Sequence, residues 1–86
     1  MTTTTTEIKP ATRPICAIAA DIRRHWPRVN YAAVPYLSAM ANINDIGDMY
    51  GYDTARSVIA YFLGNAGTWK GDDARRIKAE LKAMLK

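Results

Sequence analysis

The sequence contains one cysteine, Cys16, and one histidine, His25. A single cysteine cannot form a disulfide within the chain, which excludes a disulfide-stapled secreted scaffold and fits a reducing compartment. A lone histidine, without cysteines or carboxylates at ligand spacing, makes neither a metal site nor a Ser/His/Asp triad. His25 also lies more than two turns from Cys16 on one predicted helix, too far to activate the thiol. We therefore expect no enzyme, no metal and no cofactor.

Long apolar runs are also missing. The longest, "ICAIAA", is far shorter than the roughly 20 residues that span a bilayer. The first residues, "MTTTTTEIKPATRP", lack the basic segment and apolar stretch of a secretory leader. We expect a cytoplasmic protein that does not bind a membrane.

The 86 residues suffice for one small domain, and 49% hydrophobic against 23% charged residues are typical of a globular chain. Residues 1–13 are rich in threonine and carry no apolar periodicity, so we expect a disordered tail there. Residues 14–86 then form a single helical domain. Because a core of this size is marginal, self-association or a partner would help to stabilise it.

Four segments have helical periodicity. The first begins near Pro14 and ends before Pro27, with Asp21, Arg23 and Arg24 predicted to face away from its apolar stripe. The stripe consists of Ile15, Ile18, Ala19, Ile22 and Trp26.

Two starting points are compatible with the sequence of the second helix, because Pro35 disfavours helical geometry at the preceding residue. Either it starts near Tyr31, capped by Asn30, with Pro35 tolerated close to its first turn, or it starts at Pro35 after a short turn. Its predicted apolar face is Ala33, Tyr36, Leu37, Met40 and Ile43.

Asp53 is the predicted N-cap of the third helix, and Asn65 and Gly67 are the residues expected to end it. It has the widest apolar face, made of Ala55, Val58, Ile59, Phe62, Leu63 and Ala66. We expect Trp69, in the following connector, to anchor that connector to the core. The fourth helix starts at Asp72 or Asp73, with Ala74, Ile77, Leu81, Met84 and Leu85 on its apolar face. Residues 42–53 predict a loop, with a short pairing of two strands as the alternative. The fold class is therefore all-α, a compact small bundle of about four helices.

Basic residues indicate a nucleic-acid interface as one alternative for function. The net charge of +4 is too small to decide for it, and lysines on the solvent-facing side of a bundle helix are the simpler interpretation. If the first and last helices lie side by side, however, seven residues would form a patch for phosphates. They are Arg23, Arg24, Arg28, Arg75, Lys78, Lys82 and Lys86.

Aromatic residues favour a protein interface instead. The chain has five tyrosines and two tryptophans but one phenylalanine, and tyrosine and tryptophan are enriched where proteins meet. In the loop, Ile46, Met49, Tyr50 and Tyr52 are the predicted contact residues. We expect a non-enzymatic protein that binds another protein or a second copy of itself.

The stretches "IRRHWPRVNYAAVPYLSAM" and "YFLGNAGTWKGDDARRIKAELKAML" resemble small proteins encoded by actinobacterial phages, plasmids and related genomes. The resemblance covers most of residues 14–85, and no function or site residue comes with it. It implies an accessory protein of a phage or mobile element that works in the cytoplasm of a bacterial host. Its partner would be a protein of the host or of the phage.

Overall fold

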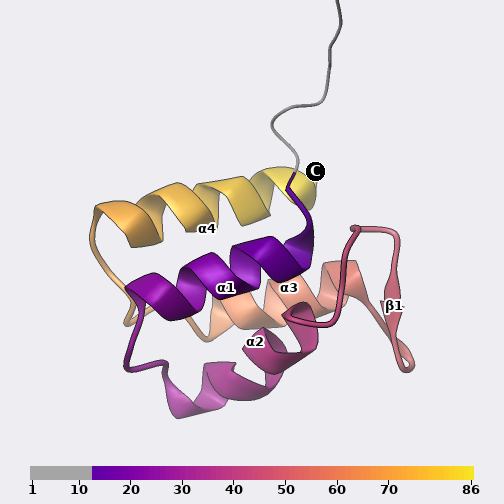
Figure 1. Cartoon of the computed structure of the whole chain (residues 1–86), viewed down its shortest axis with the longest axis horizontal. Coiled ribbons are helices and arrows are strands. Elements are labelled where there is room, and N and C mark those ends of the chain that lie inside the picture. The colour runs from indigo at the N-terminus through magenta and orange to yellow at the C-terminus, as the bar shows by residue number, and fades with distance from the viewer. Residues whose placement is uncertain (1–12) are drawn as a thin grey trace, which may run out of the picture.

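The structure, a computed structural model, describes residues 13–86 and has four α-helices and a very short hairpin (Figure 1). The predicted tail lies outside the described residues except for Arg13. The elements are α1 (Ile15–His25), the 3-10 turn η2 (Tyr31–Ala33), α2 (Val34–Met40), β1 (Met49–Tyr50), β2 (Asp53–Thr54), α3 (Ala55–Gly64) and α4 (Asp72–Met84). The prediction of a compact, mostly helical domain is confirmed.

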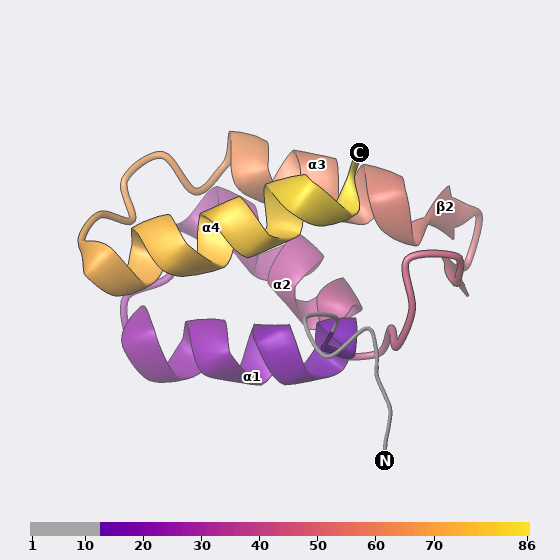
Figure 2. The same ribbon diagram turned by 90° about the horizontal axis from the view of Figure 1, so that it is seen from above.

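The helices form a closed ring around one core. α1 packs against α2 and α4, and α3 packs against the same two helices (Figure 2). The residues predicted on the apolar face of α1 are buried, as are those of the third helix except Leu63, which is half-buried. Ile77 and Leu81 of α4 have no exposed area. The ring therefore forms because each amphipathic helix buries its apolar face against two neighbours.

Two tryptophans close one end of this core. The rings of Trp26 and Trp69 stack 5.3 Å apart at an angle of 6°, and Trp26 meets Phe62 edge-on at 6.2 Å. Trp69 is 4% exposed, which confirms that it anchors the connector between α3 and α4. The connector is thus held by side-chain packing.

The start of the second helix combines the two alternatives, because the α-helix begins at Val34 after a 3-10 turn. Helical geometry begins at Tyr31 as η2, where the side chain of Asn30 accepts a hydrogen bond from the Ala32 amide. Pro35 then occupies the first turn of α2. Proline is tolerated there because first-turn amides lack partners within the helix.

The loop predicted over residues 42–53 contains the short strand pairing that was its alternative. Met49 pairs with Thr54 and Tyr50 with Asp53, so the second strand extends one residue past the predicted loop. Gly51 adopts φ 63°, a left-handed conformation that suits glycine in a tight hairpin turn. The turn places Tyr52 at the tip of the hairpin.

The prediction that Asp53 caps α3 is wrong. Asp53 lies in β2, opposite Tyr50, and Thr54 is the N-cap instead. The Oγ1 atom of Thr54 accepts a hydrogen bond of 3.0 Å from the Ser57 amide. Strand pairing therefore moves the helix start by one residue, an effect that no local capping pattern contains.

Replacing Thr54 with alanine is expected to lower the free energy of unfolding by about 1 kcal/mol, the usual contribution of an N-cap side chain. Urea unfolding followed by circular dichroism at 222 nm measures it. Asp53→Ala is the matched control and should change stability by less than about 0.5 kcal/mol. The reverse order of the two effects would mean that Asp53 caps the helix.

Candidate functional site

The hairpin presents three of the four predicted contact residues to solvent. Met49 is 57% exposed, Tyr50 43% and Tyr52 102%, whereas Ile46 is partly buried against the core. The preceding loop is ordered by its own acids, since Asp48 Oδ2 accepts hydrogen bonds from the amides of Asn44 and Asp45. The hairpin is therefore a supported projection with an apolar and aromatic surface.

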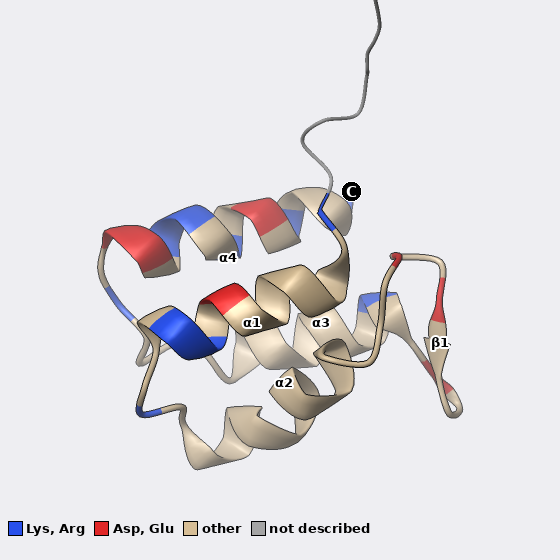
Figure 3. Cartoon of the chain, viewed as in Figure 1, with Lys and Arg blue, Asp and Glu red and all other residues tan. Residues whose placement is uncertain are grey.

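A second exposed surface was missed by the sequence analysis. Residues 29–44 and 57–69 contain no Lys, Arg, Asp or Glu, and they supply η2, α2 and most of α3. Figure 3 shows α2 without charged positions, in contrast to α1 and α4. Because α2 packs along α3, their exposed sides adjoin. We call this surface the uncharged face.

Aromatic side chains stand on the uncharged face. Tyr31 is 91% exposed, Tyr61 56% and Val34 41%. The ring of Tyr61 stacks on that of Tyr36 with centroids 5.4 Å apart, which joins α3 to α2 at the surface. The length of the two charge-free stretches is the signal that would have located this surface from the sequence.

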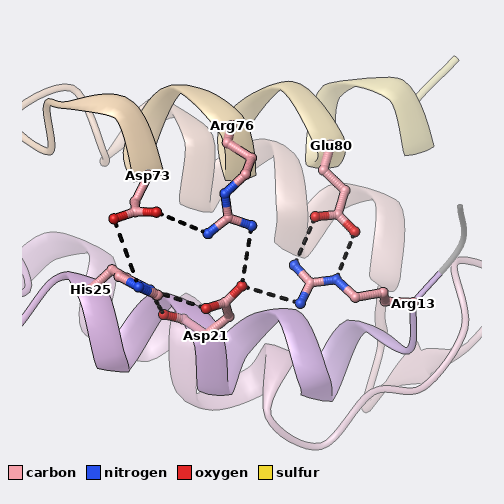
Figure 4. Close-up of polar contacts among 6 residues, drawn as sticks. All are labelled: Arg13, Asp21, His25, Asp73, Arg76 and Glu80. Atoms are coloured by element: carbon pink, nitrogen blue, oxygen red, sulfur yellow. Dashed lines mark hydrogen bonds and ion pairs between the residues drawn. The ribbon is translucent and has the colours of Figure 1, made fainter.

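The facing sides of α1 and α4 carry a network of ionisable side chains (Figure 4). Asp21 is at its centre: Oδ2 lies 3.1 Å from Arg13 Nη1 and 3.5 Å from Arg76 Nη1, and Oδ1 lies 3.0 Å from His25 Nδ1. The guanidinium of Arg13 donates two hydrogen bonds, of 2.8 and 2.9 Å, to Glu80. The last member is Asp73, which pairs with Arg76 at 3.1 Å and lies 3.7 Å from His25 Nε2.

The prediction that Asp21 faces away from the core with Arg23 and Arg24 is wrong, because Asp21 is only 9% exposed. Burial alone would raise the pKa of Asp21. The hydrogen bond from Arg13 and the positive charges of Arg13 and Arg76 outweigh burial and hold this pKa below its ordinary value. The hydrogen bond to Glu80 correspondingly raises the pKa of Arg13. The network thus joins α1 to α4.

The facing sides of α1 and α4 do not supply the patch expected for the seven basic residues of the nucleic-acid alternative. α1 and α4 do lie side by side, but the network occupies their facing sides. Arg23 is on another side of α1, with Nη2 3.4 Å from Ser38 Oγ of α2. Arg24 and Arg28 are exposed, on α1 and beyond its end.

On α4, by contrast, the basic residues stay together on the side away from α1. At 100° per residue Arg75, Lys78 and Lys82 fall on one flank, and Lys86 follows the end of the helix. Arg75 pairs with Asp72, and Lys78 donates a 2.7 Å hydrogen bond to the Trp69 carbonyl. Burial, followed by the charges of Lys70 and Lys82, lowers the pKa of Lys78. This flank is therefore a local concentration of positive charge.

Among residues 13–86, His, Cys, Asp and Glu side chains form no group of three or more that would hold a metal ion. The Cys16 thiol donates to Asn44 Oδ1 at 3.2 Å. Each helix in the described part of the chain is too short or too polar to cross a bilayer. No family model, curated protein or solved structure matches the chain.

Proposed function

We propose that this protein is a non-enzymatic module that binds another protein through the uncharged face. The observation that carries the proposal is the exposure of Tyr31, Val34 and Tyr61 on a surface without charged residues. The centres of protein interfaces are depleted of charge and enriched in tyrosine. The core uses other side chains of the same helices, among them Leu37, Met40 and Phe62, which have no exposed area.

The Tyr36–Tyr61 stack supports the same function. Binding costs free energy when mobile side chains become fixed, and a ring that already stacks on a neighbour has less freedom to lose. The resemblance to proteins of phages and mobile elements suggests a bacterial or phage protein as the partner. The nucleic-acid alternative has less support, because paired acidic and basic side chains occupy the facing sides of α1 and α4.

The double variant Tyr31→Ser/Tyr61→Ser is expected to lose a partner that the wild type retains. Immobilised protein is incubated with actinobacterial lysate, with and without phage infection, and bound proteins are quantified. The expected loss for the partner is about ten-fold or more, as for central aromatic residues of interfaces. Both side chains are more than half exposed, so the variant should still fold, although it loses the stack of Tyr61 on Tyr36.

Arg24→Ser/Arg28→Ser is the matched control, since it changes two exposed residues outside the uncharged face. It should capture the same partner as the wild type. Equal capture by all three proteins would contradict the proposal. Micromolar binding of duplex DNA at low salt, lost in the arginine variant, would favour the nucleic-acid alternative.

A further inference from the structure

One end of the molecule is acidic and aromatic. Residues 42–54 contain Asp45, Asp48 and Asp53 and no basic residue. At the hairpin tip within this segment, Tyr52 is fully exposed and precedes Asp53. Such a projection, an aromatic ring beside a carboxylate, suits a partner that offers an apolar hollow with a positive rim.

A hollow with those properties lies where α4 begins. Its volume is about 170 Å³, and Trp69, Lys70, Gly71, Ala74, Arg75 and Lys78 line it. Trp69 and Ala74 supply apolar walls, and three cationic side chains surround them. This hollow, which we call the basic pocket, is open to solvent, and its volume is similar to that of an engineered cavity of about 150 Å³ that binds benzene.

Of the three cations around the basic pocket, Arg75 pairs with Asp72, and among residues 13–86 Lys70 and Lys78 form no ion pair. Lys78 carries a pKa lowered by burial and by the neighbouring charges of Lys70 and Lys82. A carboxylate placed at this rim would offset the repulsion that Lys70 and Lys82 exert on Lys78. The pocket is therefore suited to an acidic group that arrives together with the ring.

The hairpin and the start of α4 lie at opposite ends of the molecule in both views (Figures 1 and 2), and the basic pocket is lined by residues at the start of α4. A hairpin thus does not reach the pocket of its own chain. We propose that it enters the basic pocket of a second copy, with Tyr52 in the hollow and Asp53 beside Lys70 and Arg75. The contact joins two different surfaces, so it is heterologous and continues head to tail into chains or rings.

This self-association rests on the protein-binding function proposed above, but it uses other residues. Both complementary surfaces belong to the same chain, which is why a second copy is the occupant that charge and shape favour. An acidic end that meets a basic end also lets copies of a chain with net charge +4 associate without opposing like charges.

The test uses one variant for each half of the contact. Tyr52→Ser removes the ring, and Lys70→Glu/Arg75→Glu reverses the rim. Sedimentation velocity from micromolar to millimolar concentration should show wild-type mass rising with concentration, and each variant should associate about ten-fold more weakly or stay monomeric. Added salt should weaken wild-type association. Far-ultraviolet circular dichroism confirms that both variants are folded.

Mixing the two variants gives the decisive measurement. The Tyr52→Ser chain keeps its basic pocket and the Lys70→Glu/Arg75→Glu chain keeps its hairpin, so together they should form a dimer that grows no further. The matched controls Tyr31→Ser and Arg24→Glu/Arg28→Glu should associate like the wild type.

Three results would overturn the inference: a wild type that stays monomeric throughout, a Tyr52→Ser chain that associates like the wild type, or a mixture without dimers. A monomer whose basic pocket instead binds duplex DNA would overturn it as well. None of these results would contradict the proposed function, because partner capture depends on the uncharged face and not on the hairpin or the basic pocket. Conversely, loss of Tyr31 and Tyr61 without effect on capture would refute the proposed function and leave self-association measurable.

Discussion

Replacing Trp26 with alanine is expected to lower the free energy of unfolding by about 3–5 kcal/mol. Trp26 is 7% exposed, stacks on Trp69 and meets Phe62 edge-on, so its removal opens a cavity between α1, α3 and the connector before α4. A domain of this size has a total stability of roughly 5–10 kcal/mol. The variant should therefore be partly unfolded at room temperature, which urea titration followed by circular dichroism measures.

Trp26→Phe is the matched variant, because it keeps an aromatic ring that can still contact Phe62 and Trp69. It should lose less than half as much stability as Trp26→Ala. The fluorescence of Trp69, the remaining tryptophan, should shift to longer wavelength in the alanine variant as water reaches its ring. Unchanged stability in Trp26→Ala would show that the two tryptophans do not close the core.

The helices could be predicted from the sequence because their information is local. The apolar spacing of Ile15, Ile18 and Ile22, and of Ile77 and Leu81, identified residues that the structure buries completely. Prolines and glycines near the ends of the segments indicated where the helices begin or end. Amphipathic helices of this length pack their apolar faces together in few ways, so periodicity sufficed for the fold class.

The errors arose where a residue's surroundings come from distant parts of the chain. Asp21 was placed in solvent by its residue type, but Arg13 and Arg76 make its burial favourable, and Arg76 is 55 positions away. The cap of α3 moved from Asp53 to Thr54 because strand pairing took Asp53. Neither partner can be inferred from residue spacing on a single helix.

The candidate surfaces could be predicted only in part. Met49, Tyr50 and Tyr52 were identified because a loop leaves large side chains few places to pack. Tyr31 and Tyr61 were missed, since on an amphipathic helix an exposed tyrosine resembles one that edges the core. The basic residues were grouped according to their helices. The packing of the helices decides which flank of α4 meets α1, and the flank that does so contains Glu80 and Asp73.

Replacing Asp21 with alanine is expected to lower the free energy of unfolding by about 2 kcal/mol at neutral pH, as for loss of hydrogen bonds to a buried charged group. The side chain is 12% exposed, and its removal leaves Arg13 with Glu80 as its remaining partner. Urea unfolding measures the loss. Arg24→Ala, on the exposed side of the same helix, is the control and should change stability by less than about 0.5 kcal/mol.

The pH dependence separates the charge of Asp21 from its packing. The pKa of Asp21 is lowered in the folded protein from its ordinary value of 3.8, so the unfolded chain takes up this proton first as the pH falls. The stabilisation is therefore complete above the ordinary value and is lost as the pH falls through the lowered pKa. The gap between wild type and Asp21→Ala should be constant near neutral pH and narrow in acid. A gap of equal size at every pH would mean that the side chain stabilises the joint between α1 and α4 by volume, and that its charge contributes nothing.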